Sequence, residues 1–85
     1  MKEKRRPFQP KAGHVYRNHG GGDFLCLGHI RKEYYTGWTA RMQNIASGWT
    51  FEARGICCYA DGRIDWDYSV GGQFAHRKEP AYETV

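Results

Sequence analysis

Apolar and polar residues alternate in three successive runs between residues 38 and 70, and this alternation predicts three neighbouring β-strands. The runs are residues 38–46, 49–60 and 63–70. The dipeptides Ser47-Gly48 and Asp61-Gly62 separate them. A glycine-containing pair between such runs is typical of a tight hairpin turn, so the sequence predicts an antiparallel meander here.

The two dipeptides also predict which residues lie opposite each other. If Asp61-Gly62 forms a two-residue type I′ turn, Ala60 faces Arg63 and the later pairs follow from it. Those pairs are Tyr59 with Ile64, Cys57 with Trp66, Gly55 with Tyr68 and Ala53 with Val70. Ser47-Gly48, treated in the same way, pairs Met42 with Ala53. Both turns predict one inner face for the central strand, made of Trp49, Phe51, Ala53, Gly55, Cys57 and Tyr59.

The flanking segments extend this meander. Residues 14–18 and 23–30 surround the glycine-rich stretch 19–22 and predict a further hairpin, whose second strand has apolar residues on both faces. Residues 31–37 lack periodicity and predict a connection, and residues 71–74 predict a bend into a final short strand. We therefore expect an all-β fold, a single small antiparallel meander of about five strands that forms an SH3-like barrel or a strongly twisted sheet.

A chain of 85 residues supports one domain, and we expect three parts in it. Residues 1–12 are expected to form a flexible basic arm, residues 13–75 the β domain, and residues 76–85 a C-terminal tail. The 3 Trp, 6 Tyr and 4 Phe supply large apolar areas for a thin core.

The net charge of +4 is concentrated at the N-terminus, while residues 12–85 carry eight basic and eight acidic residues. One interpretation is a solubilising segment, and the other is an arm that contacts phosphates with steep salt dependence. The candidate nucleic-acid contacts are Lys2, Lys4, Arg5, Arg6 and Lys11.

The outer face of the predicted meander carries mixed charges from three neighbouring strands. These candidate protein-contact residues are Arg41, Gln43, Glu52, Arg54, Asp65 and Asp67. One interpretation is a solvated surface with weak ion pairs, and the other is a face that recognises a protein partner.

Chemistry-bearing motifs are absent from this sequence. The hairpin already explains Asp65 and Asp67 as outward polar residues, and the three cysteines show no Cys-x-x-Cys spacing. We expect no catalytic residues, no metal site and no cofactor, and hence no enzyme. The charged N-terminus lacks a following apolar stretch, and no segment has the length of a membrane span, so we expect a cytoplasmic protein with reduced thiols and no membrane contact.

Three segments carry a resemblance to a known group of proteins. They are residues 16–26, with Tyr16-Arg-Asn18 and Gly20–Cys26, residues 44–51, and residues 59–68 around Asp61-Gly62. Through these segments, which lie within residues 14–74, the chain resembles small proteins encoded by phages and mobile elements of gut Firmicutes. The resemblance implies a compact accessory protein that acts by binding, and it assigns no catalytic residues.

The sequence thus favours a non-enzymatic protein-interaction module that binds a partner through an exposed sheet face or an edge strand. The alternative is a nucleic-acid-binding accessory protein that uses the basic arm together with Arg41, Arg54 and Arg63 and a stacking aromatic residue.

Overall fold

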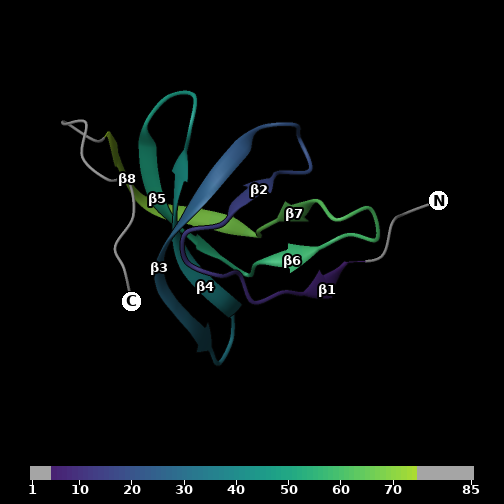
Figure 1. The fold of residues 1–85 in the computed structure, drawn as a ribbon. Helices are drawn as coiled ribbons and strands as arrows, with labels where there is room; N and C mark the ends of the chain where they lie inside the picture. The colour runs from purple at the N-terminus through teal and green to yellow at the C-terminus, as the bar shows by residue number, and fades with distance from the viewer. Residues whose placement is uncertain (1–4, 75–85) are drawn as a thin grey trace.

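A computed structural model of the chain describes residues 5–74, which are organised entirely in strands, turns and loops (Figure 1). The strands are β1 (Arg6–Pro7), β2 (Val15–Arg17), β3 (Asp23–Glu33), β4 (Gly37–Asn44), β5 (Trp49–Arg54), β6 (Cys57–Cys58), β7 (Ile64–Asp65) and β8 (Tyr68–Phe74). Within residues 5–74 there is no helix of the length and apolar character needed to cross a membrane.

The strands form two antiparallel sheets. The larger has five strands in the order β2-β3-β4-β5-β8, and the smaller has three in the order β1-β6-β7. A single parallel bridge between Asn18 and Ile64 links the two sheets. The larger sheet stays open, with β2 and β8 at its edges, so the all-β twisted meander is confirmed and the closed SH3-like barrel does not form.

The two sheets separate at Gly55, where the long second strand of the predicted meander bends. Gly55 has a φ of 77°, and its N–H and that of Ile56 both donate to the carbonyl oxygen of Trp38. Two residues opposite one partner are the signature of a β-bulge, which bends and twists its strand. The bend turns Ile56 into the core, although the predicted alternation placed it outside.

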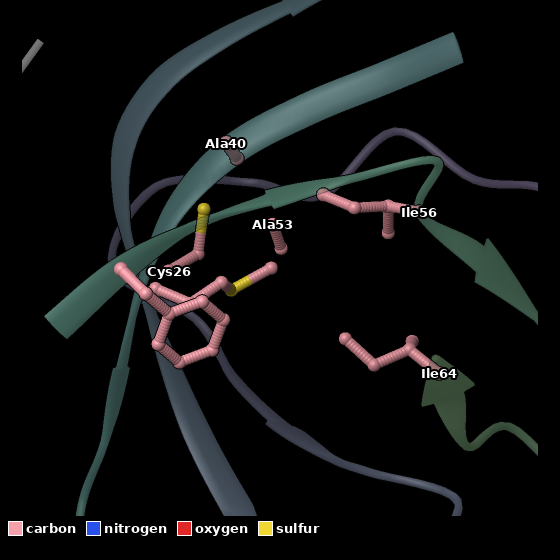
Figure 2. Packing of buried hydrophobic residues seen from close by; sticks show 7 residues of the cluster. Cys26, Ala40, Ala53, Ile56 and Ile64 are labelled. Atoms are coloured by element: carbon pink, nitrogen blue, oxygen red, sulfur yellow. The ribbon is translucent and has the colours of Figure 1, made fainter. Parts of the chain in front are cut away.

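The core lies where β6 and β7 fold against the larger sheet. Its buried cluster consists of Cys26, Ala40, Met42, Phe51, Ala53, Ile56 and Ile64. Figure 2 shows Ile56 and Ile64 directed toward the side chains of the larger sheet. Edge-to-face aromatic contacts extend the cluster, because the ring of Phe24 lies 5.8 Å from that of Phe51 and 4.9 Å from that of Trp66.

The turn at Ser47-Gly48 changes the register, while Phe51 and Ala53 stay on the predicted inner face; Trp49, which was also predicted inside, is exposed. Met42 lies opposite Phe51 instead of Ala53. Ser47 has no positive φ, so the turn is not a two-residue type; Asn44 begins a wider turn, with its side-chain oxygen accepting the N–H groups of Ala46 and Ser47. The register moves by two residues, and an even shift leaves every side chain on the same face.

The turn at Asp61-Gly62 also differs from the predicted type, and it changes the pairing of strands with a larger effect than the turn at Ser47-Gly48. Only Gly62 has a positive φ there, whereas a type I′ turn needs it at both positions. The N–H of Tyr59 donates to the carbonyl oxygen of Arg63, which closes a three-residue loop. Pairing moves by one residue, so Cys57 faces Asp65 and the predicted pair with Trp66 is wrong.

The one-residue shift continues into β8. Tyr68 lies opposite Arg54, and Val70 lies opposite Glu52. Both side chains are therefore exposed on the charged face, where the prediction had placed them inside. Trp66 still contacts the core because it falls in the break between β7 and β8.

The upstream hairpin is confirmed, with Val15 opposite Leu25. In β3 the residues Leu25, Cys26 and Leu27 are all buried, in agreement with a strand covered on both faces. Irregularities at Gly28 and His29, which has a φ of 54°, add residues to β3 before it continues to Glu33. The predicted connection is thus shorter than expected, and residues 71–74 continue β8 without bending back.

The segment expected to be a basic arm contributes to the described domain from residue 5 onward. Arg6 and Pro7 pair with β6, the N–H of Phe8 donates to the carbonyl oxygen of Ile56, and Pro10 is fully buried. Burial of Phe8 and Pro10 supplies the apolar contact that holds this segment in place. Residues 1–4 and the expected tail, 76–85, lie outside the described residues.

Candidate functional site

The edge strand β8 is the most exposed element of the larger sheet. All of its residues are exposed, and among the described strands it pairs with β5 alone. Its sequence from Tyr68 to Phe74 contains no charged residue. Charged side chains on an edge strand normally discourage the addition of another strand, so this edge lacks one of the common protections.

Aromatic and aliphatic side chains accompany this edge. Tyr68 and Val70 are exposed on one face, and the rings of Trp49 and Phe74 lie 4.8 Å apart at the far end of the strand. The Trp49 indole lies so close over Gly72 that a Cβ there would overlap it. Tyrosine and tryptophan are the residue types that most often dominate protein–protein contacts.

The charged face beside β8 is held together by ion pairs. Glu52 accepts from Arg31 at 2.6 Å and from Arg54 at 2.9 Å, while Arg31 also reaches Glu33 at 2.8 Å. Arg41 lies opposite Glu52 and Gln43 opposite Thr50. Four predicted contact residues therefore share this face, which consists of Arg41, Gln43, Glu52 and Arg54.

The other two predicted contact residues lie elsewhere. Asp65 belongs to the smaller sheet, where its carboxylate accepts the N–H of Trp66. Asp67 follows it and forms an ion pair of 2.6 Å with Arg5 instead of approaching Arg54 with its side chain. The six residues do not form one surface, because the break between β7 and β8 redirects the chain after Asp65.

The predicted nucleic-acid contacts are also divided. Arg5 is occupied by Asp67 and by the thiol of Cys57, whereas Arg6 and Lys11 are exposed and have no ion pair within residues 5–74. Lys2 and Lys4 lie outside the described residues. The Arg63 guanidinium, which was part of the same hypothesis, lies 3.7 Å from the Asp61 carboxylate.

A cavity of about 250 Å³ lies between β1, the turn after β3 and the bend at Gly55. Its apolar walls include Pro7, Trp38 and Ile56, and Arg5, Arg6, Thr36, Cys57 and Asp67 supply its polar groups. The Arg5 Nε donates to the Cys57 sulfur at 2.9 Å. Burial raises the pKa of the Cys57 thiol, and the opposing effect of Arg5 does not compensate, so the thiol is neutral and not activated as a nucleophile.

Sequence reasoning missed this cavity, whereas it placed the two tyrosines beside the cavity in a connection between strands. Tyr34 and Tyr35 are 89% and 91% exposed at the tip of the β3–β4 hairpin, directly before the lining residue Thr36. The missing periodicity of residues 31–37 indicated the connection, but nothing local indicated a cavity next to it. No group of three or more potential metal ligands occurs within residues 5–74.

Comparison of the chain with protein-family models, with curated proteins and with solved structures finds no match.

Glu52 is expected to make the stability of the domain depend on acid pH. Burial raises the pKa of this carboxyl, but the hydrogen bond from Arg54 and the charge of Arg31 outweigh it, and the pKa lies below its usual value. A lowered pKa in the folded state adds stability above the unfolded-state pKa, which is lost as pH falls through the folded-state pKa.

The variant Glu52→Gln should therefore lose less stability than the wild type between pH 5 and pH 3, roughly the range in which a glutamate titrates. Urea midpoints at three pH values measure the difference. Glu33→Gln, which removes a carboxylate paired with Arg31 alone, is the matched control. Identical pH profiles for Glu52→Gln and the wild type would contradict the expectation.

Proposed function

We propose that this chain is a non-enzymatic protein-interaction module that binds an extended segment of a protein partner along the free edge of β8. The observation that carries the proposal is an edge strand of seven exposed residues without a charge, flanked by exposed apolar side chains. An added strand would gain main-chain hydrogen bonds from Tyr68–Val70, the part of β8 before the irregularity at Gly71, which has a φ of 64°, and its alternate side chains would contact Tyr68 and Val70.

The opposite edge of the larger sheet suits this role less well. β2 has only three residues, and Arg17 at its end forms an ion pair of 2.6 Å with Asp23. The next residue, Asn18, already bridges to Ile64 of the smaller sheet. A short and charged edge that continues into another contact offers little room for a further strand.

Further observations support a binding role in a reducing compartment. Cys26, Cys57 and Cys58 are free cysteines, which is typical of cytoplasmic proteins. The neutral Cys57 thiol is consistent with a role other than nucleophilic catalysis. The resemblance of residues 14–74 to accessory proteins of phages and mobile elements favours the same class of function.

A charge placed on the edge should abolish partner binding. We expect Val70→Lys to reduce retention of the partner at least tenfold, because lysine on an edge strand opposes strand addition. The stability should change by no more than about 0.5 kcal/mol, since Val70 is exposed. Partners captured from host lysate by the wild type are identified, purified and titrated against the wild type and the variant.

The matched control is Val15→Lys, which adds the same charge to an exposed valine of the other edge strand. It should bind the partner as the wild type does. Equal binding by Val70→Lys and the wild type, with both variants folded, would refute the assignment to β8.

Nucleic acid remains the alternative partner, because Arg6 and Lys11 are exposed and carry no ion pair within residues 5–74. Titration of single- and double-stranded oligonucleotides at low and moderate salt tests it. The deletion used for comparison must end at residue 4, since Phe8 and Pro10 are part of the packed domain. Salt-sensitive binding that disappears in Arg6→Gln and Lys11→Gln would favour this alternative over β8.

A further inference from the structure

The cavity beside β1 combines a small apolar space with cationic groups at its wall. Its volume of about 250 Å³ is below the usual range of cofactor and drug-sized sites, so its size suits one small group. Pro7, Trp38 and Ile56 supply apolar surface, and Gly37 and Gly55 also line the cavity, where they leave the space that side chains would occupy.

The charges of the lining leave one cation without a counter-charge. Arg5 is neutralised by Asp67 at 2.6 Å and is further fixed by its bond to the Cys57 sulfur. Arg6 also lines the cavity, is exposed, and has no ion pair or side-chain hydrogen bond within the described part of the chain. A guanidinium presents five N–H donors in a plane, which matches the two oxygens of a carboxylate.

A neutral polar group of the lining is also unsatisfied. The hydroxyl oxygen of Thr36 is buried and has no hydrogen-bond partner among the described residues. A buried hydroxyl without a hydrogen-bond partner is energetically unfavourable, because it has lost its bonds to water and gained none from the protein. Rotation of the Thr36 side chain about its Cα–Cβ bond would direct the hydroxyl into the cavity. A ligand atom there would then become its hydrogen-bond partner.

We propose that this cavity is a binding site for a carboxylate carried on a short apolar or aromatic stem. The carboxylate is held by Arg6 and accepts from the Thr36 hydroxyl, and the stem lies against Trp38, Pro7 and Ile56. A monoanion fits better than a phosphate ester, because the lining offers one unpaired arginine, Arg6, for two negative charges and also contains the carboxylate of Asp67. The site is separate from the β8 edge and does not depend on the function proposed for it.

The test uses the full chain and follows the indole N–H resonance of Trp38 by NMR during titration. Phenylacetate should give a saturable shift in the millimolar range, and phenylacetamide, which has the same shape without the charge, should bind at least tenfold more weakly. Phenyl phosphate should bind more weakly than phenylacetate. Equal shifts with phenylacetate and phenylacetamide, or tighter binding of phenyl phosphate, would overturn the proposal.

Two variants assign the interaction to residues. Arg6→Gln should weaken phenylacetate binding at least tenfold, whereas Arg63→Gln, which removes an exposed arginine of the Asp61-Gly62 hairpin, should not change it. Thr36→Val should weaken binding without lowering the urea midpoint, because it removes an unsatisfied hydroxyl of nearly the same volume. Wild-type affinity in Arg6→Gln, or a Thr36→Val variant that binds normally, would overturn the assignment.

The source of the carboxylate is distinguished with peptides. A short peptide that ends in phenylalanine with a free C-terminal carboxylate is compared with its amidated form. Binding of the free form at least tenfold more tightly than phenylacetate supports the C-terminus of a protein as the natural ligand. Binding no tighter than phenylacetate supports a free small organic acid at the same site.

Discussion

Truncation of Phe51 to alanine should destabilise the domain by about 3–5 kcal/mol, the range measured when a buried aromatic residue is removed from a core. Phe51 is only 6% exposed, and its ring lies 5.8 Å from that of Phe24 and 5.4 Å from that of Trp66. The substitution removes the ring on which both neighbours pack, and the open sheet has few other large side chains to fill the cavity. Urea denaturation measures the loss.

In a chain of 85 residues such a loss approaches the whole stability, so the variant should be largely unfolded at 37 °C. Ile45→Ala is the control, since Ile45 is large and apolar but exposed in the turn after β4. It should cost no more than about 0.5 kcal/mol. A Phe51→Ala variant as stable as Ile45→Ala would show that the aromatic cluster does not carry the core.

Substitution of Gly55 by alanine is the second change with a large expected effect. Gly55 has a φ of 77°, and an added Cβ would overlap the carboxylate of Asp67. The variant meets two penalties, because alanine is unfavourable at positive φ by about 1–2 kcal/mol and the overlap adds roughly 1–3 kcal/mol. Displacement of Asp67 also releases Arg5, so the lining of the cavity should change with the stability.

Gly48→Ala separates these two penalties. Gly48 has a φ of 80°, and no heavy atom beyond its chain neighbours lies within 4 Å of the place that a Cβ would take, so the variant experiences the backbone strain alone. Gly55→Ala should therefore be clearly less stable than Gly48→Ala by urea denaturation. Equal stabilities of the two variants would mean that Asp67 moves away freely and that the bend does not depend on the close approach.

The second expectation depends on the bend at Gly55, which also defines the candidate sites. The bulge turns Ile56 into the core and brings the segment Arg5–Pro7 against Cys57. The break before Tyr68 then leaves β8 as an uncovered edge of the larger sheet in the described structure. The cavity and the edge strand are therefore consequences of the same change of direction, although they are independent as binding sites.

The sequence alone determined the approximate positions of the strands of the larger sheet and one face of the core. Alternation with a period of two is a property of neighbouring residues, and it correctly placed Met42, Phe51 and Ala53 together inside. It also predicted the first hairpin and the buried character of β3 on both faces, because three consecutive apolar residues leave no solvent-facing side. These features need no knowledge of distant contacts.

The tertiary structure decided the register of the second hairpin, the position of the N-terminal segment and the sites. Asp61-Gly62 is compatible with a two-residue turn and with the longer loop that forms, and burial of Ile56 and Ile64 favours the longer one. Likewise, the basic composition of residues 5–11 does not reveal that Phe8 and Pro10 pack against the domain and that Asp67 pairs with Arg5. Local sequence decides which side chains share a face, whereas contacts between segments far apart in the chain decide which edges and cavities remain open.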